Sequence, residues 1–229
     1  MWKQSAAKRR KAAAMDLFDY MRANTMEKES PLASRMRPTT LDEVVGQKHI
    51  IGKDKLLYRA IKADKLGSVI FYGPPGTGKT TLAKVIANTT SARFEQINAT
   101  VAGKKDMEEI VKNAKDAIGM YGKKTILFVD EIHRLNRQVE EVLYPAMEDY
   151  AIDIMIGKGP GARSVRLNLP KFTLVGATTR AGMLTAPLRD RFGVVHHLEL
   201  YNEEELKTII LRSAHVLGVE IEDEGAMEL

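Results

Sequence analysis

Gly73-Pro74-Pro75-Gly76-Thr77-Gly78-Lys79-Thr80 is the most informative segment of this chain. It fits the pattern G-x-x-x-x-G-K-[ST], in which a glycine-rich turn joins a strand to a helix. The apolar run Val69–Tyr72 before it predicts the strand, and the apolar spacing of Thr81–Ala87 after it predicts the helix. The glycines allow backbone N–H groups to point at phosphate oxygens, and the helix N-terminus adds partial positive charge. The sequence therefore predicts a binding loop for a nucleoside triphosphate.

Two side chains of this loop suit the phosphates and their metal. Lys79 would reach the β- and γ-phosphates, and we therefore expect it to be a catalytic residue as well as a binding one. The Thr80 hydroxyl would be a ligand of Mg²⁺. ATP and Mg²⁺ are the cofactors that this chemistry implies. The residues of the loop expected to contact the nucleotide are Gly73, Pro74, Pro75, Gly76, Thr77, Gly78, Lys79, Thr80 and Thr81.

A second apolar run, Thr125–Val129, ends in the acidic pair Asp130-Glu131. It is typical of a buried parallel strand, and open α/β sheets bind ligands at the carboxyl ends of such strands. An acidic pair after a strand is commonly a solvated loop, but the phosphate loop upstream favours a catalytic role. We expect Asp130 to hold Mg²⁺ through water and Glu131 to polarise the water that attacks the γ-phosphate.

Composition limits the class of protein. The 229 residues can hold one full domain and part of a second, and 44% hydrophobic residues support a packed core. The absence of cysteine excludes disulfides and cysteine-based zinc sites. No apolar run is long enough to span a membrane, and the first residues lack the apolar region of a secretory signal, so a cytoplasmic protein without membrane contact is expected.

The net charge of +5 comes from the N-terminus. Residues 1–14 carry five basic side chains and no acidic one, which leaves 30 basic and 30 acidic side chains in the rest of the chain. The remaining sequence therefore shows no bulk basic excess of the kind that marks a nucleic-acid-binding domain. Lys8-Arg9-Arg10-Lys11 could touch phosphates, but such a run is more often a solvated tail.

Strand and helix patterns alternate along the chain after a polar arm at 1–35. This alternation predicts an α/β fold, with a parallel sheet covered by helices on both faces. The predicted strands are 69–72, 94–98, 125–129, 172–176 and 194–200. The predicted helices lie near 80–90, 106–118, 136–149 and 203–217.

One segment, 151–169, interrupts the alternation. Two short runs of alternating apolar residues flank the glycine-rich Gly157–Gly161, which predicts a β-hairpin. A mobile surface loop is the alternative, but the regular alternation favours an ordered arm with one apolar face for a partner. The residues of that face are Ile152, Ile154, Ile156, Val165 and Leu167.

Together with the phosphate loop, three further motifs resemble the AAA+ family of P-loop ATPases: Leu127–Glu131, Gly176-Ala177-Thr178-Thr179 and Leu188–Phe192. The resemblance implies a five-stranded parallel sheet of order 5-1-4-3-2 flanked by helices, with a β-hairpin insertion. It also implies a nucleotide-binding domain over 36–200 and the beginning of a helical lid over 201–229.

The two halves resemble different AAA+ members. Residues 15 to about 131 resemble RarA (also called MgsA), a replication-associated recombination ATPase, on Pro31–Pro38, Phe71–Gly73 and Ile97–Thr100. Residues from about 132 to 229 resemble RuvB, a Holliday-junction branch-migration ATPase, on Asn136–Asp149 and the hairpin. We expect a chimera, natural or built, with its seam in Asp130–Arg134; a single divergent family is the alternative. Residues 1–14 match neither.

The resemblance also implies roles for single residues. Thr179 would sense the γ-phosphate or the attacking water, and Asn98 would restrain Glu131 at rest. Arg191 would be the arginine finger that reaches a neighbouring subunit's nucleotide, with Arg189 as the weaker candidate and a surface salt bridge as the alternative role. The residues implied on the adenine side are Arg37, Pro38, Val44, Val45 and Gly46.

Three functions follow as hypotheses. The first is an ATPase motor of DNA recombination or repair, of helicase or branch-migration type. It would be a bacterial-type cytoplasmic homo-oligomer that acts on junctions or stalled forks with a RuvA-like partner held by the hairpin. The second is a nucleotide-binding module with little turnover that docks a partner through the hairpin. The third is a sliding-clamp adaptor, because Met15-Asp16-Leu17-Phe18 resembles the bacterial clamp-binding peptide, although Ala14 stands where that motif favours Gln.

Overall fold

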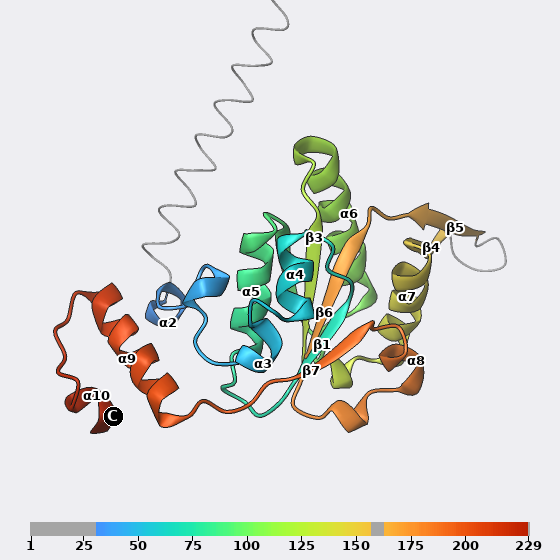
Figure 1. The fold of residues 1–229 in the computed structure, drawn as a ribbon. Coiled ribbons are helices and arrows are strands. Elements are labelled where there is room, and N and C mark those ends of the chain that lie inside the picture. Colours follow the sequence, from blue (N-terminus) through green and yellow to red (C-terminus); the bar gives the residue numbers. More distant parts are fainter. Residues whose placement is uncertain (1–30, 157–162, 229) are drawn as a thin grey trace, which may run out of the picture. The chain divides into compact units, whose positions relative to one another are not determined.

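The computed structural model describes residues 31–156 and 163–228 (Figure 1). They form two compact units. One unit contains the described residues up to Arg37 together with Arg212–Glu220; the other contains Pro38–Leu211 and the residues from Ile221 onward. The second unit carries the sheet and both predicted motifs. No helix among the described residues combines the length and apolar character needed to cross a membrane.

A five-stranded parallel sheet forms the centre of the larger unit, as predicted. Its strands run in the order β2-β3-β6-β1-β7. Counted in chain order without the two hairpin strands, this reads 5-1-4-3-2 from the β7 edge. The five strands are β1 (Val69–Tyr72), β2 (Arg93–Asn98), β3 (Thr125–Asp130), β6 (Phe172–Thr178) and β7 (Val194–His197).

Burial along the strands follows their place in the sheet. In β3 every residue from Thr125 to Val129 is buried, as expected of a parallel strand with helices on both faces. The edge strand β2 has only exposed and half-buried positions instead. Helices cover both sheet faces (Figure 1). In chain order these are α3 (Lys48–Ile51), α4 (Leu56–Lys62), α5 (Lys79–Thr89), α6 (Lys104–Tyr121) and α7 (Arg137–Glu148).

Two apolar layers hold the sheet between these helices. One layer contains Phe71 and Phe128 from the strands and Val85 and Ile86 from α5. The other contains Leu127, Val129 and Leu174 from the strands together with side chains of α7. Because successive strand residues point to opposite faces, Leu127 and Phe128 belong to different layers. Burying both faces of the central strands is the main apolar contribution to the fold.

The predicted strand 194–200 is too long. β7 ends at His197, which is the partner of Tyr72, the last residue of β1. Beyond this pair Leu198 N still donates to Tyr72 O at 2.7 Å. The backbone of the next residue, Glu199, forms its hydrogen bonds with the Gln47 side chain instead of with β1. Its Nε2 donates to Glu199 O at 2.7 Å and its Oε1 accepts from Glu199 N at 3.1 Å. A side chain far away in sequence therefore ends this strand.

The predicted hairpin is present as β4 (Ala151–Ile156) and β5 (Arg163–Asn168), which pair antiparallel. Ile152 faces Leu167 and Ile154 faces Val165 across the ladder. One partner-face assignment needs correction. Ile152 is only 2% exposed, and with Ala151 it anchors the base of the hairpin in the protein. Of the other predicted partner residues, Val165 is exposed and Leu167 is half-buried, and Ile154 and Ile156 lie in β4.

We predict that Gly176→Ala destabilises the fold. Gly176 lies in the central strand β6, and a Cβ built there would stand 2.8 Å from Ile132 Cδ1 and 3.3 Å from its Cγ2. Overpacking of this kind costs about 1–3 kcal/mol, measurable as a lower midpoint in urea unfolding. The matched control is Gly119→Ala on the exposed side of α6, where a Cβ meets nothing within 4 Å. That change should stabilise by about 0.5–1 kcal/mol; equal effects at both glycines would contradict the packing described.

Candidate functional site

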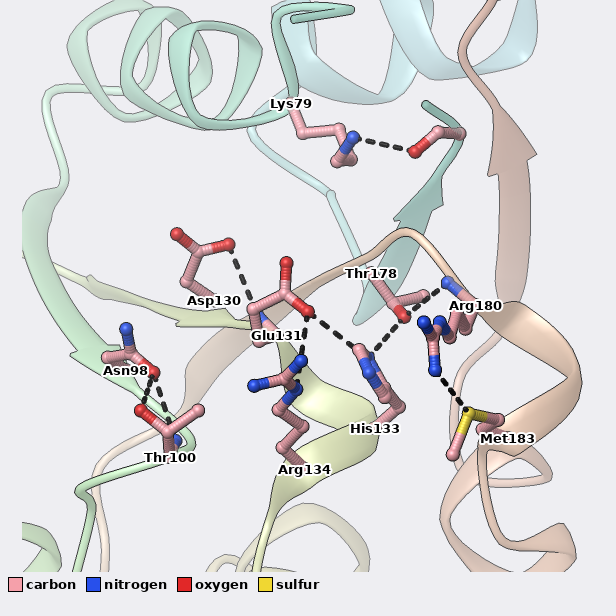
Figure 2. A network of polar contacts seen from close by, with 11 residues as sticks. Lys79, Asn98, Thr100, Asp130, Glu131, His133, Arg134, Thr178, Arg180 and Met183 are labelled. Carbon is pink, nitrogen blue, oxygen red and sulfur yellow. Dashed lines mark hydrogen bonds and ion pairs between the residues drawn. The ribbon is translucent and has the colours of Figure 1, made fainter. Parts of the chain in front are cut away.

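The candidate site lies at the carboxyl edge of the sheet, where three neighbouring parallel strands end (Figure 2). β1 leads into the phosphate loop and α5, β3 ends at Asp130, and β6 ends at Thr178. The register pairs Tyr72 of β1 with Thr178 of β6. The backbone ladder therefore brings the loop, the acidic pair and the end of β6 to one place.

The phosphate loop depends on its glycines at two positions. Gly73 has a φ of +151°, and a Cβ there would stand 2.2 Å from the carbonyl oxygen of Leu198. Gly78, at the start of α5, has a φ of +85°, and a Cβ there would stand 2.6 Å from the Tyr201 hydroxyl. At both positions glycine is required for two reasons: the backbone has a positive φ, and there is no space for a Cβ.

Lys79 lies inside the curve of the loop. Its Nζ donates to Gly73 O at 2.8 Å and to Pro74 O at 2.6 Å. Burial lowers the pKa of Lys79, whereas the charges of Asp130 and Glu131 raise it. The loop therefore holds a cation beside the N-terminus of an 11-residue helix, with two carboxylates nearby. This combination favours a polyanion accompanied by a divalent cation.

The acidic pair has a strained backbone. Glu131 has a φ of +52°, which non-glycine residues adopt rarely and which is often found at functional sites. Asp130 Oδ1 accepts from Glu131 N at 3.1 Å. The Glu131 carboxylate lies 3.5 Å from His133 Nδ1 and 3.9 Å from Arg134 Nε. These contacts direct the Glu131 side chain away from Asn98, whose Oδ1 instead accepts from Thr100. The expected restraint of Glu131 by Asn98 is not formed here.

His133 and Thr178 complete a buried polar network that the sequence analysis missed (Figure 2). The Thr178 hydroxyl and His133 Nδ1 lie 2.7 Å apart, and Arg180 N donates to Thr178 Oγ1 at 2.9 Å. The His133 side chain is 2% exposed, and burial lowers its pKa. Thr179, predicted as the sensor, lies one residue beyond β6 and is half-buried. The residue that contacts His133 is its neighbour Thr178.

Arg191 is engaged within its own subunit. Its Nη2 lies 2.8 Å from Glu148 Oε1, its Nη1 donates to Pro187 O at 2.6 Å, and its guanidinium lies 4.4 Å from the centre of the Tyr144 ring. The salt bridge considered as the alternative role is therefore present. Arg189 is the more open of the two arginines, with its Nε 3.9 Å from Asp190.

The residues expected on the adenine side are divided between the two units. Gly46 lies against the ring of Tyr201, since a Cβ there would stand 3.1 Å from two ring atoms. The same tyrosine approaches Gly78, so Tyr201 joins this segment to the phosphate loop, and burial raises its pKa. Pro38 and Val45 belong to this unit, whereas Arg37 belongs to the other, where its carbonyl accepts from Arg212. Sequence reasoning missed Tyr201 because no local pattern marks it.

Comparison with known proteins gives one consistent family. The family described as Holliday junction DNA helicase RuvB P-loop domain matches residues 36–198. The chain is 48% identical over 207 residues to the Holliday junction branch migration complex subunit RuvB of Fusobacterium nucleatum. That match covers 89% of this chain and 60% of the relative, so the chain spans about three fifths of its length.

Solved structures of RuvB from Thermotoga maritima agree. The structure named as its Holliday junction branch migration motor superposes with a TM-score of 0.68 at 40% identity. It covers 84% of this chain and 58% of that one. A single-substitution variant of the same protein gives a TM-score of 0.69 at 42% identity, covering 83% of this chain and 58% of that one.

The expected chimera finds no support. The RuvB match at 36–198 runs across the predicted seam at Asp130–Arg134 and includes most of the part expected to resemble RarA. The expectation of a RarA-like half rested on short segments such as Ile97–Thr100. Local resemblance in such motifs therefore did not identify the family of this half.

We predict that Lys79→Ala lowers the affinity for Mg-ATP at least about 30-fold in titration calorimetry. The reason is that charge-assisted hydrogen bonds contribute about 1.5–3 kcal/mol each. The matched control is Lys112→Ala, a lysine on the exposed face of α6. Unchanged affinity in the Lys79 variant would remove the loop as the binding site.

Proposed function

Since the chain belongs to the RuvB family of AAA+ P-loop ATPases, we propose that it is the ATP-hydrolysing part of a Holliday junction branch-migration motor. One observation carries this proposal: Lys79, Asp130 and Glu131 meet at one edge of the sheet. Phosphoryl transfer to water needs three groups: a cation that binds the phosphates, an oxygen ligand for a metal and a carboxylate that orients the attacking water. Branch migration is named for the relatives, whose chains extend well beyond the matched part.

Each residue would have a separate task. The loop amides and Lys79 would bind the β- and γ-phosphates, with Lys79 exchanging the carbonyls of Gly73 and Pro74 for phosphate oxygens. The Thr80 hydroxyl and the Asp130 carboxylate are hard oxygen donors and would hold Mg²⁺. That ion would neutralise charge on the phosphates. Glu131 would orient a water in line with the γ-phosphate, and Thr179, beside Thr178, would sense it.

Arg191 would act in trans as the arginine finger of a neighbouring copy, and the active protein would be a homo-oligomer. For this role its guanidinium must leave Glu148 and the Tyr144 ring. Such an arginine stabilises charge on the departing phosphoryl group. Residues 36–200 would be the nucleotide-binding domain and 201–229 the beginning of its lid. Tyr201, which lies against both Gly46 and Gly78, would close the adenine side of the site.

The hairpin would be the docking arm for a RuvA-like junction-binding protein. Its base is anchored by Ile152, whereas Val165 on β5 is exposed and available. Junction DNA would then be brought to the motor by that partner. The proposed clamp-binding peptide Met15–Phe18 lies outside the described residues, and the comparisons give it no support.

We predict that Glu131→Gln binds Mg-ATP as the unsubstituted chain does but turns it over at least about 100-fold more slowly. The amide keeps the shape of the side chain and loses the charge that orients water, so the loss concerns the transition state alone. Affinity is measured by calorimetry and turnover by phosphate release. The matched control is Glu141→Gln, whose carboxylate pairs with Arg137 on the exposed surface of α7.

Two outcomes would contradict this assignment. Turnover by Glu131→Gln at the rate of the unsubstituted chain would show that another group activates the water. Loss of ATP binding in the same variant would show that Glu131 stabilises the bound ground state, which contradicts its assignment as the residue that only activates water.

We predict that Arg191→Ala leaves ATP affinity within about twofold and removes the part of turnover that rises with protein concentration. A finger that acts on a neighbour contributes nothing to an isolated subunit, and where it acts it is worth about 10³–10⁵ in rate. Turnover per subunit is measured over a hundredfold dilution series, with Arg189→Ala as the matched variant. A rate per subunit that is independent of concentration in the unsubstituted chain would exclude the trans role.

A further inference from the structure

We propose that His133 is a positioning residue for Glu131: its Nδ1–H, anchored on the Thr178 hydroxyl, sets the direction of the Glu131 carboxylate and couples it to the end of β6. The proposal rests on the proposed function, because it concerns the same hydrolytic step. The two buried residues, His133 and Thr178, would orient Glu131 through the contacts described next.

The geometry places one ring nitrogen between two oxygens. His133 Nδ1 lies 2.7 Å from Thr178 Oγ1 and 3.5 Å from Glu131 Oε2 (Figure 2). The first distance is that of a strong hydrogen bond, and the second is a longer charge contact. His133 belongs to the turn Ile132–Arg134 directly after β3, and Thr178 is the last residue of β6. The ring therefore bridges two strand ends.

The neighbouring donors decide which atom carries the proton. Arg180 N donates to Thr178 Oγ1 at 2.9 Å, and the second lone pair of this oxygen can accept from one further donor. If Nδ1 were unprotonated, its lone pair would face the Glu131 carboxylate, and the two would repel each other. With the proton on Nδ1, the same N–H donates to Thr178 and attracts Glu131. The carboxylate thus favours the Nδ1–H tautomer of the neutral ring.

The surroundings keep the ring neutral and fixed. Its side chain is 2% exposed, and burial lowers its pKa. The charged groups that face it are Glu131, which favours the imidazolium form, and Arg134 and Arg180, which oppose it. Below the turn, Ile132 is fully buried against Gly176 of β6. A neutral ring held by packing can orient a carboxylate without neutralising it, which is what a water-activating glutamate requires.

A core histidine that only fills space is the simpler account of the same burial. It predicts that an apolar side chain of similar size serves as well. The contacts predict otherwise, since loss of the N–H leaves the Thr178 hydroxyl and the Glu131 carboxylate without a common donor. Misplacement of a catalytic group by about 1 Å can cost 10²-fold in rate.

The test uses four variants of the whole chain. His133→Leu removes both ring nitrogens and keeps an apolar side chain suited to burial. His133→Asn returns an amide N–H near the place of Nδ1. Thr178→Val removes the hydroxyl with little change of shape and covers the case in which His133→Leu fails to fold. His215→Asn, at an exposed histidine of α9 (Glu203–Leu217), is the control.

We expect kcat for Mg-ATP to fall about 10- to 100-fold in His133→Leu while KM and the affinity for a non-hydrolysable analogue stay within about twofold. In His133→Asn most of the lost kcat should be recovered, and in His215→Asn kcat should equal that of the unsubstituted chain. In Thr178→Val kcat should lie between the values for His133→Leu and the unsubstituted chain. A kcat for His133→Leu or a folded Thr178→Val within twofold of the unsubstituted chain overturns the inference. So does an equal loss in kcat and in affinity.

A readout without turnover separates this inference from the proposed function. In proton NMR the His133 resonance is identified by its loss in His133→Asn, and its pKa is followed by pH titration. Because the Glu131 charge favours the imidazolium, Glu131→Gln should lower the pKa of His133 further. An unchanged pKa overturns the coupling even if the chain hydrolyses ATP. A chain that binds and hydrolyses no ATP, yet shows the shift, would contradict the proposed function alone.

Discussion

The parallel pairing of β1, β6 and β3 determines where the phosphate loop, the acidic pair and the end of β6 lie. The central strands are buried on both faces, so their backbone groups must pair with one another, and their apolar pattern specifies the register of the observed ladders. With all three running in one direction, their carboxyl ends reach the same edge. Lys79, Asp130 and Thr178 come from segments far apart in sequence, and the register alone brings them together.

The apolar layers support the unusual backbone at this edge. Glu131 has a positive φ, which costs energy and persists only where its surroundings hold it. Directly after it, Ile132 is fully buried against Gly176, and His133 is tied to Thr178. The turn is therefore fixed on one side by packing and on the other by polar contacts. If Glu131 activates water as proposed, its carboxylate is already held in place without a nucleotide, as electrostatic preorganisation requires.

Local patterns carried the parts of the site that could be predicted from sequence. The phosphate loop and the strand before Asp130 are continuous segments whose residue types alone determine their conformation. The length of β7 depends on Gln47, and the contact between His133 and Thr178 depends on strand register; neither is visible in a single segment. The burial of Ile152 likewise follows from packing against other elements. The expected chimera rested on short segments, whereas the RuvB family match extends over 36–198 and gives the chimera no support.

A crystal structure with Mg²⁺ and a non-hydrolysable ATP analogue would show whether these residues bind and hydrolyse ATP. We expect Lys79 Nζ to leave the carbonyls of Gly73 and Pro74 for the β- and γ-phosphates. We also expect a water between the γ-phosphate and the Glu131 carboxylate, with His133 still in contact with Thr178. An analogue bound away from the phosphate loop, or a Lys79 that stays on the two carbonyls while the nucleotide is present, would contradict these expectations.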